Sequence, residues 1–368
     1  MDRQPERTWA EIDLEALRHN AHVARQRVGP GVALLAVIKA NAYGHGLAQI
    51  AKALASEAEL FGVANLGEAL ETQRAIADRP VLILGPAFPA ERPEIVAHGF
   101  IASVSSAEEA AAFAAEARQK TVQLNLVIDT GMGRMGCAED AAVETVRKIM
   151  ALRAVTLHSI STHLPVADED EPFTRQELTR FESLVEAVRA SAPGGYKVHA
   201  LLSAGVLGFN ETPFDIVRAG LMLYGISPLP RRQDLLRPVL SLKSRVVLLR
   251  DLPAGATISY GRTFTTPRAM RVATIGVGYA DGYPRALSNR GAVVLIRGRR
   301  CAVLGRVTMD LIVVDVSHVG GVKPGDEAVL IGRQGDNEIL ASEIAERAST
   351  IPWEIFTGIG TRVRRVYL

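Results

Sequence analysis

The chain is poor in cysteine, balanced in charge and without a long apolar run, and each shortage excludes a class of protein. Its two cysteines, Cys137 and Cys301, cannot build a disulfide framework or a four-ligand zinc site, and no metal site is predicted. The 42 basic and 40 acidic residues leave a net charge of +2, which favours neither nucleic acid nor an anionic membrane as a partner. No segment approaches the roughly eighteen apolar residues of a membrane helix, and the start lacks the apolar core of a signal peptide. We therefore expect a soluble, cytoplasmic protein.

The rhythm of apolar runs predicts an α/β fold in two domains. Between residues 8 and 230, eight short apolar runs such as "TVQLNLVID" alternate with stretches of helical period such as "SAEEAAAFAAEARQ". This pattern predicts a parallel (β/α)8 barrel of the TIM type. From 231 to 368, strands separated by Gly, Pro and Asp turns predict a mostly antiparallel β domain, which the first few N-terminal residues could join.

A lysine closes one of the apolar runs, in "AVIKANAYGHG" at residues 36–46. In a parallel barrel, the C-terminal ends of the strands carry the chemistry, so Lys39 is predicted to face that end. A lysine at a strand end commonly extends to water. Partly desolvated, it would instead have a lowered pKa and act as a nucleophilic amine. The run alone leaves both interpretations open.

A glycine-rich segment, "DTGMGRMG" at residues 129–136, contains the bare GxGxxG pattern of dinucleotide-binding loops. That fingerprint also needs an acidic residue at the end of the next strand, and "VTLHSISTH" offers none. Nucleotide binding is therefore disfavoured. Arg134, inside the loop, is better suited to contact an anion or a phenolate.

Motifs along the whole chain resemble those of bacterial alanine racemases. They are "AVIKANAYGHG", "DTGMGRMG", "STHLPVADE", "VRAGLMLYG", "ISYGRTF", "VGYADGY", "RVTMD" and the opening "TWAEIDLEALRHN". The resemblance implies a pyridoxal 5'-phosphate barrel with an appended β domain, a small amino-acid substrate, and a homodimer whose two active sites use residues of both subunits. It also implies interconversion of L- and D-alanine, supplying D-alanine for peptidoglycan.

The resemblance implies two catalytic bases. Lys39 resembles the lysine that holds the cofactor and serves as one base, and Tyr260 resembles the opposing tyrosine of the other subunit. Racemisation takes a proton from one face of a planar carbanion and returns one to the other, so two bases suffice without turning the substrate. A free tyrosine has a pKa of about 10, so the phenolate needs positive neighbours, for which His163 and Arg218 are the family's candidates.

Arg218, in "DIVRAG", resembles the arginine that faces the cofactor's pyridine nitrogen. A guanidinium has no acceptor and keeps its protons, so its partner nitrogen should stay unprotonated. The ring is then a weaker electron sink, which disfavours transamination and favours return of the proton to the α-carbon.

The remaining site residues are carried over from the same motifs. The predicted cofactor-binding set, besides Lys39 and Arg218, is Tyr43, Arg134, His163, Ser203, Gly220, Leu221 and Trp353. The predicted substrate-binding set is Arg134, Met309 and Asp310. The predicted entrance set is Asp168, Tyr279, Arg285 and Arg306.

Two positions depart from the family's pattern. The family's carbamylated lysine, which braces the arginine of the "DTGMGR" loop, falls at Val127, and valine cannot be carbamylated. A tyrosine near the phosphate and the substrate falls at Trp353, whose indole is bulkier and has one donor and no acceptor. We therefore expect Arg134 to have a different partner and the substrate pocket to be smaller.

We consider three alternative functions for this sequence. A non-catalytic cofactor-binding barrel would lack the β domain that carries "ISYGRTF". A basic amino-acid decarboxylase of the same architecture would have an acidic group in place of Arg218 and an active-site cysteine in its β domain. A broader racemase that also acts on serine or other small amino acids is harder to separate from an alanine racemase by sequence.

Overall fold

The computed structural model describes residues 6–209 and 214–368, which form two compact units. The barrel unit comprises Arg18–Ala42 and Leu47–Leu236. The β unit comprises residues 6–17, Tyr43–Gly46 and Arg237–Leu368. A near-closed parallel barrel and a mostly antiparallel sheet confirm the predicted fold class. The domain limits of 8–230 and 231–368 stay predictions.

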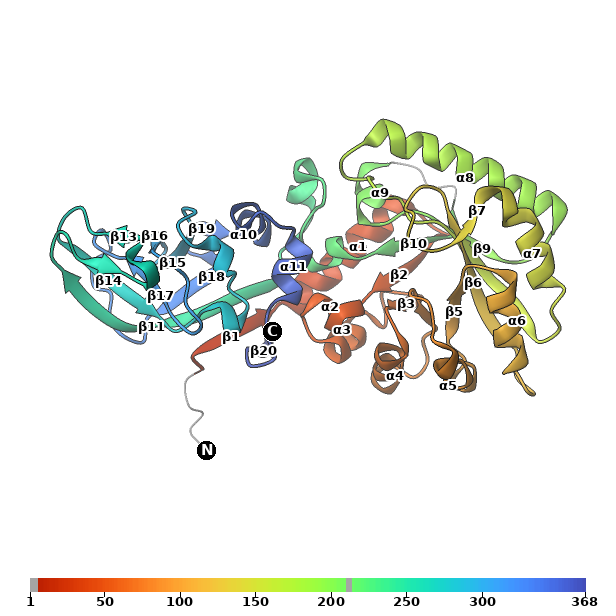
Figure 1. The fold of residues 1–368 in the computed structure, drawn as a ribbon, viewed down its shortest axis with the longest axis horizontal. Coiled ribbons are helices and arrows are strands. Elements are labelled where there is room, and N and C mark those ends of the chain that lie inside the picture. The colour runs from red at the N-terminus through yellow and green to blue at the C-terminus, as the bar shows by residue number, and fades with distance from the viewer. Residues whose placement is uncertain (1–5, 210–213) are drawn as a thin grey trace. The chain divides into compact units, whose positions relative to one another are not determined.

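The barrel unit is a sheet of eight parallel strands in the order β10-β2-β3-β4-β5-β6-β8-β9 (Figure 1). Backbone bonds from Asp215 N to Val198 O and from Arg218 N to Leu201 O, each 2.9 Å, join the two ends of this sheet. The strands are nearly all buried, as expected for a sheet covered on both faces. They are β2 (Ala33–Val37), β3 (Leu60–Val63), β4 (Val81–Ile83), β5 (Ile101–Val104), β6 (Val122–Asp129), β8 (Val155–Ser161), β9 (Lys197–His199) and β10 (Ile216–Ala219), with short β7 (Cys137–Ala138) beside β6.

Helices connect successive barrel strands, and several begin at a side-chain cap. Asn65 accepts from Glu68 N, Ser106 from Glu109 N and Asp170 from Phe173 N. The helices of this half of the chain are α1 (Leu14–Val28), α2 (Lys39–Tyr43), α3 (Leu47–Leu54), α4 (Leu66–Ala75), α5 (Arg92–His98), α6 (Ala107–Ala115), α7 (Ala142–Met150), α8 (Glu171–Ser191) and α9 (Ser203–Gly208). Short 3₁₀ turns complete it: η1 (Pro89–Glu91), η2 (Glu139–Ala141), η3 (Leu221–Tyr224) and η4 (Pro230–Leu235).

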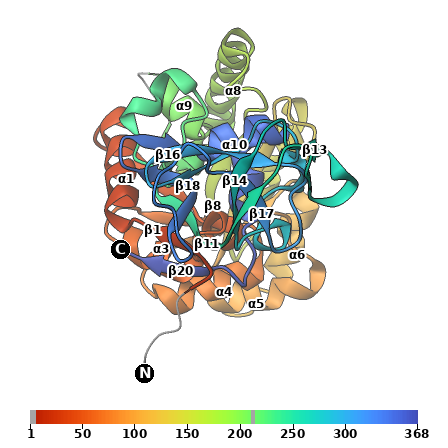
Figure 2. The ribbon, with the colours of Figure 1, turned by 90° about the vertical axis from the view of Figure 1, so that its left-hand side faces the viewer.

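The β unit is built on a nine-stranded sheet in the order β19-β18-β15-β16-β17-β14-β11-β1-β20. Its pairings are antiparallel except that of β1 with β20. Figure 2 labels several of these strands, among them β1, β11, β14 and β20. The strands are β1 (Thr8–Ile12), β11 (Leu240–Leu252), β14 (Met270–Ile275), β15 (Val293–Ile296), β16 (Arg299–Leu304), β17 (Ile312–Asp315), β18 (Glu327–Gln334), β19 (Asn337–Ile339) and β20 (Arg364–Tyr367).

Smaller elements complete the β unit. They are a separate hairpin of β12 (Thr257–Ile258) and β13 (Phe264–Thr265), the turns η5 (Tyr260–Arg262), η6 (Tyr279–Asp281) and η7 (Arg285–Leu287), and the helices α10 (Ala341–Ala348) and α11 (Pro352–Thr357). None of the helices described in either unit has the length and the hydrophobicity of a membrane-spanning helix.

Candidate active site

Lys39 follows the end of strand β2 and opens a left-handed turn. The predicted strand included this lysine, but the observed strand ends at Val37 because the backbone reverses its handedness. Ala40, Asn41 and Ala42 all have φ of 53°. Left-handed backbone costs roughly 1–2 kcal/mol per non-glycine residue, and such strain gathers at functional sites. The turn therefore marks Lys39 as a positioned side chain.

Two side chains hold the left-handed turn in place. Glu68 Oε1 accepts from Ala40 N at 2.7 Å, and Asn41 Oδ1 accepts from Leu47 N at 2.8 Å. Asparagine tolerates left-handed backbone better than most residues. Asn41 is therefore a motif residue that helps to hold the turn with its side chain, and Glu68 supports it from helix α4.

The two glycines of "AYGHG" are required by close packing within the β unit. A Cβ on Gly44 would lie 2.2 Å from Phe356 O, and one on Gly46 would lie 1.9 Å from Tyr367 Oη. Both also have positive φ, 79° and 101°. His45 between them is buried, with Nδ1 2.8 Å from Tyr43 O.

Four cationic or basic groups of the barrel unit influence one another. Burial, and then the charge of Arg134, lower the pKa of Lys39. Burial, and then Arg218, Arg134 and Lys39, lower the pKa of His163 to about 3. Burial, and then Arg134, lower the pKa of Arg218 to about 10. The cluster suits an anionic ligand, and the lowered lysine pKa favours the neutral, nucleophilic amine.

Arg218 on β10 is fixed by four hydrogen bonds. Nη1 donates to His199 Nδ1 at 2.7 Å and to His199 O at 3.0 Å. Nη2 donates to Thr162 O at 2.6 Å and to Ala200 O at 2.8 Å. Among the described residues, no acceptor is recorded for Nε, and Arg218 forms no ion pair. One N–H of a rigid guanidinium is therefore free to meet a ligand atom that can only accept.

A buried chain of hydroxyl and carboxyl oxygens, which we did not predict from the sequence, includes Thr162, the residue whose carbonyl accepts from Arg218. Thr130 Oγ1 lies 2.7 Å from Thr162 Oγ1 and donates to Glu177 Oε1 at 2.5 Å. Glu177, on α8, has no exposed surface, and burial raises its pKa. A threonine on each of two neighbouring strand ends was the available signal, but nothing local links either one to residue 177.

Ser203 and Gly220 meet after the last two strands of the barrel. Ser203 Oγ accepts from Gly220 N at 2.9 Å and from Met222 N at 3.3 Å. Within the described residues, Leu221 N has no recorded acceptor. In TIM barrels the loops after the last two strands are the usual phosphate site. The hydroxyl proton of Ser203 and the Leu221 amide are the donors available there.

The GxGxxG loop does not have the geometry of a dinucleotide site. Asp129 accepts from Gly131 N at 3.1 Å and from Gly133 N at 3.0 Å, and these bonds lower its pKa. Its carboxylate therefore occupies the amides that a pyrophosphate would use. Helix α7 begins only at Ala142, so the loop does not open a helix.

Arg134 and Val127 bear on the missing carbamate. Val127 is buried in the second half of β6. Arg134 is exposed. Within residues 6–209 and 214–368, it forms no hydrogen bond or ion pair with another residue. No protein group of the described chain therefore replaces the carbamate as its brace.

Tyr260 stands on a turn of the β unit with unusual backbone. Ser259, Gly261 and Arg262 around it have φ of 64°, 72° and 52°. Ser259 Oγ donates to Arg306 O at 2.6 Å, which fixes the turn against the next loop. Tyr260 is 72% exposed. The strained turn therefore presents the tyrosine outward.

Two further loops of the β unit carry the other predicted substrate and entrance residues. Tyr279 N donates to Thr308 O and Ala280 N to Met309 O, both at 3.0 Å. Tyr279 and Met309 are 41% and 53% exposed. The side chain of Asp310 is paired with Arg362 at 2.8 Å.

Trp353 lies against Tyr43 within the β unit. The two side chains share a hydrogen bond, in which the indole N–H must be the donor, and burial raises the pKa of Tyr43 to about 12. The structure thus brings these two predicted phosphate-side residues together. Asp168 and Arg285, from the predicted entrance set, are both exposed.

Comparisons with known proteins agree along the whole chain. Residues 12–228 match the family described as alanine racemase, N-terminal domain, and residues 239–367 match alanine racemase, C-terminal domain. The chain is 42% identical over 366 residues to an alanine racemase of Symbiobacterium thermophilum, covering 98% of this chain and 97% of that one. It is 41% identical over 367 residues to an alanine racemase of Carboxydothermus hydrogenoformans, covering 98% and 99%.

Solved structures give the same result. An alanine racemase of Clostridium difficile 630 superposes with a TM-score of 0.92 at 30% identity, covering 100% of this chain and 97% of that one.

Proposed function

Because the chain belongs to the alanine racemase family, we propose that it interconverts L- and D-alanine with pyridoxal 5'-phosphate and two bases, Lys39 and Tyr260. Lys39 is the main support for this proposal, because burial and the charge of Arg134 lower its pKa. An amine with a lowered pKa is suited both to holding an aldehyde cofactor and to moving a proton.

The described residues of the barrel unit fit this cofactor. Arg218 offers Nε–H to a pyridine nitrogen that can only accept, and Ser203 and the Leu221 amide can donate to a phosphate. The positive charge of Arg134 suits a phenolate oxygen. When bound, pyridoxal phosphate supplies an electron sink for the electron pair left on the α-carbon. Arg218 keeps its protons at neutral pH, so it would leave the pyridine nitrogen of the bound cofactor unprotonated.

The two proposed bases have separate tasks. Lys39 exchanges the α-proton on one face of the substrate, and Tyr260 of the partner subunit does so on the other. His163, whose pKa is lowered to about 3, stays neutral at physiological pH. We therefore assign His163 the role of a neutral hydrogen-bonding partner of Tyr260. Arg218 supplies the positive charge that the tyrosine phenolate needs.

The homodimer is part of the proposal. Tyr260, Tyr279 and Met309 are large and exposed, 72%, 41% and 53%, on one unit. In a dimer with shared sites they would be covered by the partner's barrel, with Met309 and Arg134 receiving the substrate carboxylate. The cytoplasmic location and the supply of D-alanine to peptidoglycan belong to the proposal as well.

The experiment that tests the function measures conversion of several L-amino acids to their D-forms. We expect L-alanine to be the best substrate, L-serine to be slower, and L-lysine and L-arginine to be unaffected. Lys39→Ala is the inactive control, and Lys52→Ala, which alters a lysine on the outer helix α3, should behave as the parent. A protein that binds the cofactor but racemises none of these amino acids would be a non-catalytic binding protein instead.

A further inference from the structure

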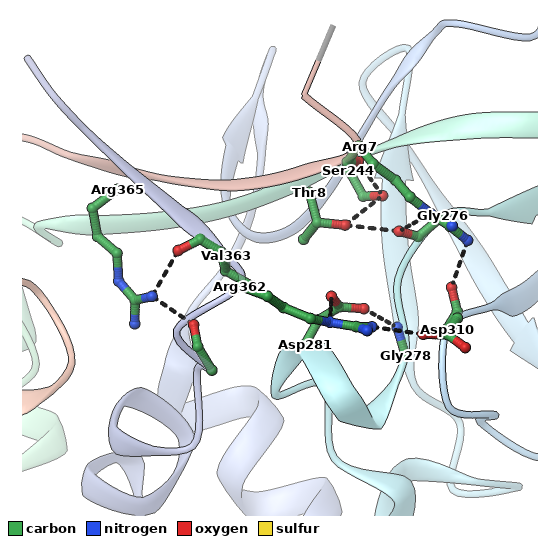
Figure 3. Close-up of polar contacts among 11 residues, drawn as sticks. Arg7, Thr8, Ser244, Gly276, Gly278, Asp281, Asp310, Arg362, Val363 and Arg365 are labelled. Atoms are coloured by element: carbon green, nitrogen blue, oxygen red, sulfur yellow. Dashed lines mark hydrogen bonds and ion pairs between the residues drawn. The ribbon is translucent and has the colours of Figure 1, made fainter. Parts of the chain in front are cut away.

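Arg362 joins two loops of the β unit that carry predicted active-site residues (Figure 3). The Tyr279 loop is residues 278–282, and the Met309 loop is residues 307–311. Arg362 Nε donates to Asp281 Oδ1 in the first loop at 2.7 Å. Its Nη2 donates to Asp310 Oδ1 in the second at 2.8 Å. One guanidinium thus makes a charged bond to each loop, and charge-assisted bonds of this kind have directional geometry.

Asp281 is well suited to transmit this restraint. Its side chain is only 8% exposed, and its second oxygen, Oδ2, accepts from Gly278 N at 2.8 Å. The carboxylate therefore ties the start of the Tyr279 loop to Arg362. A buried carboxylate that lost its cation would be strongly disfavoured, so the loop and the arginine depend on each other.

The two loops also touch directly, and no side chain could fit between them. A Cβ on Gly278 would lie 2.2 Å from Thr308 O and 2.3 Å from Met309 O. Because the backbones are this close, a shift of one loop must move the other. Arg7 holds the far side of the Met309 loop, donating to Asp310 O at 3.0 Å (Figure 3).

The pairing also bears on the role of Asp310. An aspartate side chain would repel a substrate carboxylate, and here that side chain faces Arg362. The backbone amides of Met309 and Asp310 have no recorded acceptor within the described residues, and Met309 is 53% exposed. The Asp310 side chain therefore holds the loop in place, and the backbone amides of Met309 and Asp310 are available to bind the substrate carboxylate.

We propose that Arg362 is a positioning residue, which sets the backbone amides of the Met309 loop and the side chain of Tyr279 in register for the substrate. This inference rests on the proposed function, in which both loops reach the active site. Arg362 touches neither cofactor nor substrate, and it acts through Asp281 and Asp310.

The kinetic test compares Arg362→Met with a matched control, Arg364→Met. Arg364 lies two residues away, has a side chain 46% exposed against 48% for Arg362, and is ion-paired with Glu6 at 2.6 Å rather than with a residue of either loop. We expect Arg362→Met to raise the KM for L-alanine about tenfold with kcat within about threefold, because a small misplacement of a binding group weakens binding sharply. Arg364→Met should leave both constants unchanged. Equal KM values in the two variants would overturn the proposal.

Two conservative variants cover a loss of folding. Asp310→Asn keeps the backbone and removes one of the two charged bonds, so it should raise KM less than Arg362→Met does. Arg362→Lys can reach only one carboxylate at a time, and it should restore part of the KM. A KM for Asp310→Asn equal to that of the parent would count against the proposal even if Arg362→Met did not fold.

Hydrogen exchange separates this inference from the proposed function. The amides of Tyr279 and Ala280, which bond across the two loops, should exchange at least about tenfold faster in Arg362→Met than in Arg364→Met. This readout needs no activity. If the parent protein has no racemase activity, the proposed function is wrong, but the exchange test can still be carried out. If the two variants exchange at equal rates, the positioning role of Arg362 is wrong.

Discussion

Arg218 Nη1 donates to His199 Nδ1 across 2.7 Å in the buried interior of the barrel. A guanidinium only donates, so His199 must accept at Nδ1 and carry its proton on Nε2. Burial and Arg218 together keep the pKa of His199 well below its ordinary value. His199 Nε2 lies 3.3 Å from Ser159 Oγ, which in turn donates to Asn125 at 2.9 Å. The orientation of Arg218 is therefore set by several strands of the barrel.

Replacing Arg218 should change what the enzyme makes. In Arg218→Glu, a carboxyl would face the pyridine nitrogen and protonate it, so D-alanine formation should fall by roughly 100-fold and the share of pyruvate should rise. The measurement is pyruvate formed per D-alanine formed.

Arg218→Gln is the matched control for this change. A glutamate would face the carbonyls of Thr162 and Ala200, whereas a glutamine amide can still donate to one of them. The glutamine variant should lose activity without raising the pyruvate share. If the glutamate variant partitions as the parent does, the explanation for Arg218 is wrong.

Lys39 should be the residue that carries the cofactor. The purified protein should be yellow, and borohydride should abolish the visible band and attach the cofactor mass to the peptide that contains Lys39. The lowered pKa of Lys39 supports this, because the neutral amine forms the bond. Attachment to any other lysine would refute the site assignment.

Stability should fall between about pH 6.5 and 4, partly through His158. Burial, and then the charge of Lys197, lower its pKa from 6.5 to about 4 in the folded protein. The unfolded chain therefore binds a proton in this window that the folded protein does not, so stability is highest above pH 6.5 and decreases as the pH falls. One such histidine contributes at most about 1.4 kcal/mol per pH unit, and less here because the ring is only partly buried.

The variant His158→Gln should therefore flatten the pH dependence of the free energy of unfolding, measured with urea at fixed protein concentration. A His158→Gln slope identical to that of the parent would contradict the predicted proton uptake.

Activity should not depend on carbon dioxide. Val127 cannot be carbamylated, so no lysine should carry a carbamate mass, and added bicarbonate should leave kcat and KM unchanged. Activity that rises with bicarbonate would show that another lysine has taken over the role.

The substrate range should be narrow and led by alanine, because the indole of Trp353 occupies room near Tyr43. Trp353→Tyr should raise the activity on L-serine relative to that on L-alanine by a few-fold, because a phenol ring is smaller than an indole. A clear preference of the parent for lysine or arginine would contradict the small pocket.

Subunit mixing tests the shared active site. Lys39→Ala and Tyr260→Phe should each be nearly inactive. After dissociation, mixing in equal amounts and reassociation, half the dimers are mixed, and each has one site with both bases intact. Activity should return to roughly a quarter of the parent value.

The control for this experiment mixes each variant with itself, which should restore nothing. No recovery despite demonstrated subunit exchange would place Tyr260 in the same chain's site as Lys39, or outside any site.

The sequence alone determined the parts of this protein that depend on local pattern. Eight apolar runs separated by helical stretches predicted the parallel barrel, because a strand buried on both faces has no room for polar alternation. The absence of an acidic partner for "DTGMGRMG" could also be seen in the sequence, since it concerns only the strand that follows the loop. The resemblance then named Lys39 and Tyr260, whose roles stay predictions.

Only the tertiary structure decided which distant residues meet. Glu177 reaches Thr130 from a helix 47 residues away, and Arg362 reaches Asp281 across 81 residues. The pattern of residues along the sequence does not predict such pairs, because side-chain contacts between elements depend on how the chain folds back. The left-handed turn after Lys39 is a further case: "KANAY" has no glycine, and its backbone is imposed by bonds from Glu68 and Asn41 rather than by its own preference.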